Sequence, residues 1–144
     1  MYQSIIELFK LNGRTALVTG GNRGLGLAMA RALAEAGANI SIAARDERAS
    51  AEAVDMIRST YGVDCIHSIC DVTREEDIAK TVDHTLAAFG TVDILINSAG
   101  INIRGSIEDL SQGDFNKVMA VNVTGSWLAC RAVIPIMKKN AWEE

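Results

Sequence analysis

The sequence predicts an α/β fold built on a doubly wound parallel sheet. Short β-branched or apolar runs alternate with longer stretches whose apolar residues recur at helical spacing. The first run leads into a glycine-rich turn, and a helical stretch starts directly after that turn. Strands joined through helices pair in parallel by right-handed crossovers, and we expect the strand order 3-2-1-4.

Three strands and two helices are expected in the first half of the chain. The predicted strands cover residues 15–19, 39–44 and 63–70, and a helix over residues 48–60 lies between the last two. The helix that follows the first strand ends at Gly37. Its apolar and small residues at helical spacing are Leu25, Met29, Ala32 and Ala36.

The third helix has recognisable signals at both ends. Thr73 and Glu76 fit a capping box at its start, and Gly90 fits its end. The residues expected to face inward are Ile78, Val82, Leu86 and Phe89. A fourth strand over residues 92–96 follows, and its nearly continuous apolar run is typical of a strand covered on both faces.

A long helix is expected to begin after Ser111 and to continue to Lys139. Two apolar stripes run along it, whereas a surface helix needs only one. The first comprises Val118, Asn122, Gly125, Ala129, Ala132 and Ile136, and the second comprises Met119, Val123, Trp127, Cys130, Ile134 and Met137. The second stripe needs a cover, so we expect a homo-oligomer or self-association through residues 112–139.

Composition and charge argue against several kinds of partner. The 144 residues are 49% hydrophobic and 22% charged, which fits one globular domain over residues 1–144. A net charge of -4 without a basic stripe predicts neither a nucleic-acid nor a membrane partner. We find no signal peptide and no apolar run of about 18 residues. Cysteines without CxxC spacing and two isolated histidines predict free thiols, a cytoplasmic location and no metal site.

The turn after the first strand carries the main binding signal. Its spacing is G-x-x-x-G-x-G, and glycines at such a turn let the backbone approach a pyrophosphate at the N-terminus of the next helix. An ordinary loop is the alternative, but a position between a strand and a helix favours nucleotide binding. The candidate cofactor-binding residues in the turn are Gly20, Asn22, Arg23, Gly24, Leu25 and Gly26.

The end of the second strand bears on the choice of nucleotide. Sites for NAD usually place an acidic residue there to bond the ribose 2′-hydroxyl, and a methyltransferase usually has one as well. Here the strand ends at Ala44 and Arg45 follows, while Arg23 lies in the glycine turn. Two guanidinium groups suit a 2′-phosphate, so NADP(H) is favoured. NAD(H) is the alternative, because a shifted strand end brings Asp46 into the acidic position.

Four motifs in order resemble the short-chain dehydrogenase/reductase family. They are T-G-x-x-x-G-x-G from Thr19, Asp71 after the third strand, Asn-Ser-Ala-Gly from Asn97, and Asn122 within Val-Asn-Val-Thr-Gly. The resemblance implies a Rossmann fold and an oxidoreductase acting on a carbonyl/alcohol pair. The opening of the chain and the segment ending at Arg104 are similar to gluconate 5-dehydrogenase and 3-oxoacyl-carrier-protein reductase relatives.

The resemblance also implies roles for these residues. Asp71, followed by Val72, stands where the family has an Asp beside the adenine ring, although an ordinary turn aspartate is the alternative. Asn97 corresponds to a mainly structural residue that fastens the fourth strand to a neighbouring loop. Asn122 matches the active-site asparagine, whose local helix distortion supports a water in the proton relay; an amide that is merely hydrogen-bonded is the alternative. The nicotinamide ribose lies against the positions of Ala99 and Gly100.

The family's catalytic Ser and Tyr-x-x-x-Lys have no counterpart in this sequence. Its two tyrosines, Tyr2 and Tyr61, are followed four positions later by Ile6 and Cys65. The chain ends soon after Trp142, where the family begins its fifth strand. We therefore expect the N-terminal, cofactor-binding part of an oxidoreductase, without the C-terminal half of the fold and inactive alone. A non-catalytic nucleotide-binding or association module is the alternative function.

Overall fold

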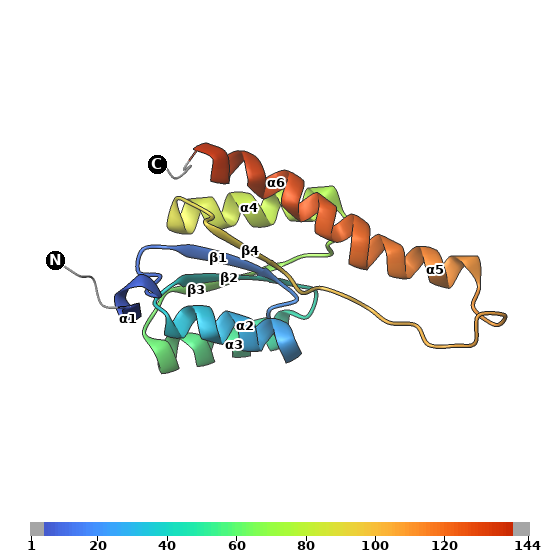
Figure 1. Cartoon of the computed structure of the whole chain (residues 1–144), viewed down its shortest axis with the longest axis horizontal. Helices are drawn as coiled ribbons and strands as arrows, with labels where there is room; N and C mark the ends of the chain where they lie inside the picture. The colour runs from blue at the N-terminus through green and yellow to red at the C-terminus, as the bar shows by residue number, and fades with distance from the viewer. Residues whose placement is uncertain (1–4, 140–144) are drawn as a thin grey trace.

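Four parallel strands form the centre of the computed structural model, which describes residues 5–139 (Figure 1). The strand order is β3-β2-β1-β4, and every neighbouring pair is parallel. The class and the order of the sheet agree with the prediction. Tyr2 and the residues around Trp142 lie outside the described residues. The strands are β1 (Thr15–Thr19), β2 (Asn39–Ala44), β3 (Cys65–Ile69) and β4 (Ile94–Asn97).

Helices cover both faces of the sheet (Figure 1). One face carries α2 (Gly24–Glu35) and α3 (Glu47–Tyr61), and the other carries α4 (Glu75–Phe89) and α6 (Gly125–Lys139). A short helix, α1 (Ile5–Leu8), precedes β1. The loop after β4 and helix α5 (Gln112–Met119) extend past the carboxyl ends of the strands, and α5 buries none of its residues.

The hydrophobic core has two parts, one on each side of the sheet. Successive residues of a strand point to opposite faces, so Val18 packs in one part and Leu17 in the other. All five residues of β1 are buried, as expected for a central strand of a parallel sheet. β4 is an edge strand whose first three residues are half-buried, and it packs on both faces as predicted, with Ile94 and Ile96 against one part of the core and Leu95 against the other.

Helix α2 buries a different stripe from the predicted one. Leu25 is 81% exposed and Met29 is 37% exposed, whereas the buried residues are Gly26, Ala30 and Ala34. The helical period was right, but the inward phase was wrong by about one residue. Small side chains face the sheet because the glycine turn brings the start of α2 very close to the end of β1.

The start of α4 also differs from the prediction. The helix begins at Glu75, and Thr73 makes no capping box with Glu76. Instead the hydroxyl and the amide of Thr73 both donate to Oδ1 of Asp71, at 2.7 and 2.9 Å. Because Arg74 is the N-cap residue, Thr73 lies one position before the cap, and its hydroxyl belongs to the Asp71 turn. Gly90 ends the helix in the left-handed conformation, as predicted.

The long helix starts as predicted but is not regular. Ser111 caps α5 in a reciprocal capping box with Asp114. A π-helical segment, η1 (Ala120–Thr124), then separates α5 from α6. Within residues 5–139 the stretch Gln112–Lys139 alone is long and apolar enough to cross a membrane by length and composition, with a mean hydropathy of 1.3 over its most apolar window. The sequence had predicted no such stretch.

The three cysteines are free thiols, as expected. Cys65 and Cys70 are buried, and burial raises the pKa of Cys65 to about 12. Burial also raises the pKa of Cys70. Cys130, on α6, is only half-buried. Among the described residues, no three potential metal ligands lie together.

Candidate functional site

A cleft of about 690 Å³ opens at the carboxyl ends of the four strands. In a doubly wound sheet this is where ligands bind, because the chain turns in opposite directions on the two sides of β1 and leaves a crevice there. Eleven of the twelve predicted cofactor residues line the cleft: Gly20, Asn22, Arg23, Gly24, Leu25, Gly26, Arg45, Asp71, Val72, Ala99 and Gly100. Asn97, the twelfth, does not line it. The lining residues that sequence reasoning did not propose include Asp46, Cys70, Ile101 and Val121.

The glycine turn is packed too tightly to accept side chains at two positions. Gly20 has a φ of 66°, and a Cβ there would lie 2.9 Å from the Cα and the amide nitrogen of Ala99. A Cβ on Gly26 would collide with the carbonyl oxygen of Gly20. The turn therefore lies directly against the loop after β4, and this close approach forms the floor of the cleft.

The N-terminus of α2 opens onto the same cleft. Arg23 is its N-cap residue and makes no side-chain cap. The first amides of a helix have no partner within the helix, and they carry the positive end of its dipole. Together with the glycine turn, they form a surface suited to a phosphate group.

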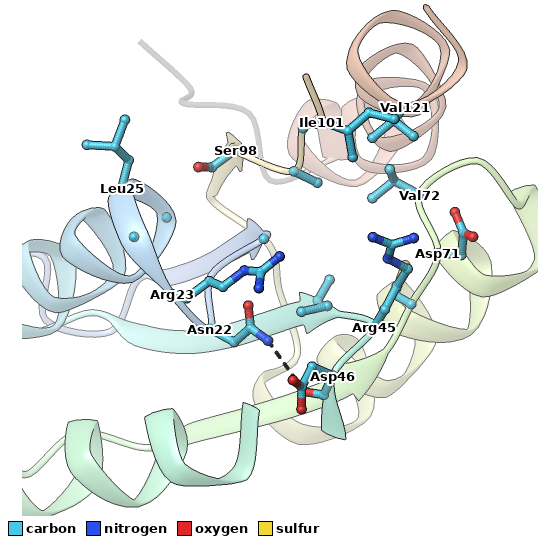
Figure 2. Close-up of a pocket in the computed structure, with 18 residues that line it drawn as sticks. Asn22, Arg23, Leu25, Arg45, Asp46, Asp71, Val72, Ser98, Ile101 and Val121 are labelled. Carbon is cyan, nitrogen blue, oxygen red and sulfur yellow. Dashed lines mark hydrogen bonds between the residues drawn. The ribbon is translucent and has the colours of Figure 1, made fainter. Parts of the chain in front are cut away.

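Two arginines reach the cleft from different elements (Figure 2). Arg23 comes from the glycine turn, and Arg45 comes from the residue just after β2. Neither forms an ion pair with another residue of the described chain. The strand ends at Ala44, as predicted, so Asp46 does not move into the acidic position. The Asp46 carboxylate instead accepts the amide of Ala49 at 3.0 Å and caps α3.

Asp71 is held in a turn at the base of the cleft. The amide and then the hydroxyl of Thr73, which both donate to its carboxylate, lower its pKa below the ordinary range. The positive charges of Arg45 and Arg74 act in the same direction. Asp71 is thus the turn aspartate that the alternative interpretation proposed, and it also lines the cleft, so its carboxylate is available there as an anionic acceptor.

Thr19 is a structural residue of the site that sequence reasoning missed. It is 2% exposed, and its hydroxyl accepts the amides of Ser98 and Ala99, both at 3.2 Å. The same hydroxyl donates to the carbonyl oxygen of Ile96 at 3.4 Å. One side chain therefore fastens the end of β1 to the loop after β4. Its place as the first letter of the T-G-x-x-x-G-x-G motif was the available signal.

Asn97 does not have the role expected of it. Its amide donates to Sγ of Cys130 at 3.4 Å, so it connects β4 to α6 and not to the neighbouring loop. Thr19 makes the connection to the loop in its place. The side chain of Asn97 points away from the cleft because successive residues at the strand end alternate in direction.

Asn122 is the central residue of η1 and contacts the loop after β4. Its Oδ1 accepts the amide of Ile101 at 2.9 Å, and its Nδ2 donates to the carbonyl oxygen of Ile101 at 3.0 Å. Asn122 does not itself line the cleft, but Ile101 and Val121 do. The helix distortion implied by the family resemblance is therefore present, and both ends of the amide bond the backbone of one residue, Ile101.

The comparisons with known proteins agree with this geometry. A family model described as short chain dehydrogenase matches residues 14–142. The chain belongs to the short-chain dehydrogenase family. The family consists of oxidoreductases, and its fold and glycine motif are those described above.

Curated relatives match most of the chain. It is 34% identical to the peroxisomal 2,4-dienoyl-CoA reductase of Arabidopsis thaliana, covering 91% of this chain and 44% of the relative. It is 39% identical to the secoisolariciresinol dehydrogenase of Forsythia intermedia, covering 91% and 48%. It is 35% identical to the rhamnolipids biosynthesis 3-oxoacyl-[acyl-carrier-protein] reductase of Pseudomonas aeruginosa, covering 94% and 52%. The chain thus spans about half the length of the curated relatives it matches.

Solved structures of the family are similar over the same part. A xylitol dehydrogenase with NAD+ bound is 36% identical and superposes with a TM-score of 0.87, covering 91% of this chain and 50% of that one. The L-sorbose reductase of Gluconobacter frateurii, complexed with NADPH and L-sorbose, is 27% identical with a TM-score of 0.87, covering 92% and 50%. Similar folds therefore hold either nicotinamide dinucleotide.

Proposed function

We propose that this chain binds NADP(H) as the cofactor-binding part of an oxidoreductase that acts on a carbonyl/alcohol pair. The observation that supports this proposal is the composition of the cleft. It combines the glycine turn, the uncapped N-terminus of α2 and two arginines that form no ion pair among the described residues. When bound, the cofactor supplies hydride transfer. The chain's own residues bind and orient it: the amides at the start of α2 donate to the pyrophosphate, and the loop of Ala99 and Gly100 supports the nicotinamide ribose.

The preference for a 2′-phosphate rests on charge. Arg23 and Arg45 both line the cleft, and the acidic residue nearest to the end of β2 is used to cap α3. A phosphate between two guanidinium groups gains charge-assisted hydrogen bonds that a hydroxyl does not. Relatives of similar fold contain NAD+ or NADPH, so family membership alone supports only a nicotinamide cofactor.

We propose further that the chain alone is inactive. In the family, a tyrosine gives or takes the proton and a lysine lowers its pKa, and this sequence has no Tyr-x-x-x-Lys. A positioned acid or base contributes roughly 10²–10⁴-fold to rate. Asn122, paired with Ile101, is the residue that matches the active-site motif here, and on its own it moves no proton. A substrate is engaged only when the second half of the fold is supplied.

Titration of the 144-residue chain with NADPH and with NADH, followed by fluorescence, tests the proposal. We expect tighter binding of NADPH and no substrate-dependent oxidation of it. Equal affinities or a bias toward NADH would contradict the cofactor preference. Oxidation of NADPH by the pure chain with a carbonyl substrate would contradict the inactivity.

An association module is the second candidate function, and one observation favours it. The outer stripe of the long helix is exposed: Val123 is 51% exposed, Trp127 is 56% exposed and Ile134 is 46% exposed. Exposed apolar patches of this kind mark interfaces. We propose self-association through this stripe, which sedimentation over a range of concentrations tests; a single monomeric species would contradict it. We also propose a cytoplasmic location and no nucleic-acid or membrane partner.

A further inference from the structure

Gly125 lies where any side chain would collide with the wall of the cleft. It is the first residue of α6 and is buried, and an added Cβ would lie 2.7 Å from Cγ2 of Val72. The same Cβ would be 3.0 Å from the Cβ of Val72 and 3.2 Å from its carbonyl oxygen. Real Cβ atoms essentially never make contacts under 3.0 Å, so the helix or the Val72 segment would have to move.

Val72 has little room to yield. Its side chain is 6% exposed and packs in the core with Cys70, Leu128 and Ala129. Its backbone oxygen takes part in the same contact, so a displacement would involve the chain and not only a rotamer change. Interiors are close-packed, and an added carbon there is accommodated by shifts of the surrounding backbone.

A shift of Val72 would pass directly to Asp71. Both residues line the cleft at the carboxyl end of β3. The Asp71 carboxylate is fixed by the amide and hydroxyl of Thr73, and its own amide donates to Asp77 at 3.1 Å. These bonds join Asp71 to residues beyond Val72 in the chain, so we expect Asp71 to move when Val72 moves.

The π-helical segment sets the position of Gly125. The amide of Gly125 donates to the carbonyl oxygen of Ala120, five residues earlier, and thereby closes the wide turn. One extra residue in that turn changes the phase of the helix, so that the residue without a side chain faces Val72. In the same segment Val121 lines the cleft, as does Ile101, and Asn122 bonds the backbone of Ile101.

We propose that Gly125 is a positioning residue that fixes the Asp71–Val72 wall of the cleft through its contact with Val72. It thereby sets the affinity for the adenine-containing half of the dinucleotide. This inference rests on the proposed nucleotide binding, although the contact itself can be tested without a nucleotide.

The test compares two identical substitutions in one long helix. Gly125→Ala adds the colliding Cβ, whereas Gly113→Ala adds a Cβ whose nearest neighbour is Oγ of Ser111 at an ordinary 3.5 Å. The probes are NADPH and adenosine 2′,5′-bisphosphate, which carries only the adenine half. We expect Gly125→Ala to weaken both by about tenfold, since overpacking of this size costs enough for that change. Gly113→Ala should stay within about twofold of the unmodified chain.

Val72→Ala separates the local collision from a general loss of stability. Because it removes Cγ2, the loss of affinity caused by Gly125→Ala should shrink in the Val72→Ala background. Affinities are compared at a temperature where every variant is folded by its melting curve. If Gly125→Ala does not fold alone, folding of the double variant supports the contact. Failure of both to fold would overturn the proposal.

Two further outcomes keep the inference separate from the proposed function. Equal affinities of Gly125→Ala and Gly113→Ala for both probes would overturn the inference while nucleotide binding stands. If the unmodified chain binds neither probe, the proposed function fails. Hydrogen exchange at the Asp71 and Thr73 amides then decides the inference: faster exchange in Gly125→Ala than in Gly113→Ala supports it, and equal exchange refutes it.

Discussion

Replacing Arg45 with aspartate is expected to shift the preference between the two dinucleotides toward NADH. Arg45 follows the last residue of β2, lines the cleft and has no ion-pair partner within residues 5–139. Its guanidinium is therefore free to bind a 2′-phosphate. The aspartate removes this donor, repels the phosphate and offers an acceptor for a 2′-hydroxyl.

The size of the effect follows from the hydrogen bond that the substitution removes. A hydrogen bond to a charged group contributes about 1.5–3 kcal/mol. Without one such bond, the ratio of the NADPH and NADH affinities changes by roughly 10- to 150-fold. Arg23 stays in place, so residual binding of NADPH is expected. Arg45 also lowers the pKa of Asp71, so a carboxylate in its place would act on Asp71 as well as on the phosphate. Arg45→Ala removes the attraction for the phosphate without adding a negative charge, and it therefore separates the two effects.

Isothermal titration of both dinucleotides into each variant measures the ratio. Arg48→Asp is the matched control, because it makes the same change of charge three residues further along the chain. The Arg48 side chain is 90% exposed and pairs with Glu52, away from the cleft lining. An unchanged ratio in Arg45→Asp, or an equal change in Arg48→Asp, would refute the reasoning that Arg45 meets the 2′-position.

Three other predictions concern the support of the cleft. Thr19→Val leaves the Ala99 amide without its acceptor and should cost about 1–3 kcal/mol in urea unfolding; a loss under about 0.5 kcal/mol, the usual surface value, would contradict the fastening role. In the folded chain Cys130 should be the fastest thiol to react with iodoacetamide, and equal labelling of the two buried cysteines by mass spectrometry would be the contrary result. The pKa of Asp71 is lower in the folded chain than in the unfolded chain, so the ionised carboxylate stabilises the fold above the unfolded-state pKa of about 3.9. This stabilisation is lost as the pH falls through the folded-state pKa. Thr73→Val should therefore reduce the unfolding free energy at pH 7 but not at the acidic end, and a pH-independent difference would argue against this linkage.

The sequence by itself determined the class of fold and the place of the site. Strand–helix alternation fixes a parallel sheet, and a glycine turn after the first strand fixes the cleft at its carboxyl edge. The end of β2 at Ala44 and the left-handed end of α4 at Gly90 were also predictable, because both depend on local residue chemistry. These features need no knowledge of distant contacts.

Other features depended on contacts that local patterns do not specify. The inward face of α2 was mispredicted because its approach to β1 favours Gly26 over Leu25 as the buried residue. The expected cap by Thr73 did not form, because α4 begins at Glu75 with Arg74 as its N-cap residue, and the Thr73 hydroxyl instead donates to Asp71.

Only the tertiary structure decided how the cleft is held together. Thr19 and Ala99 are far apart in sequence, yet a single hydroxyl joins their loops. Val72 and Gly125 meet because η1 alters the phase of the long helix, and no local pattern specifies that phase. Periodicity and turn chemistry act within a few residues, whereas close packing depends on which segments the completed fold brings into contact.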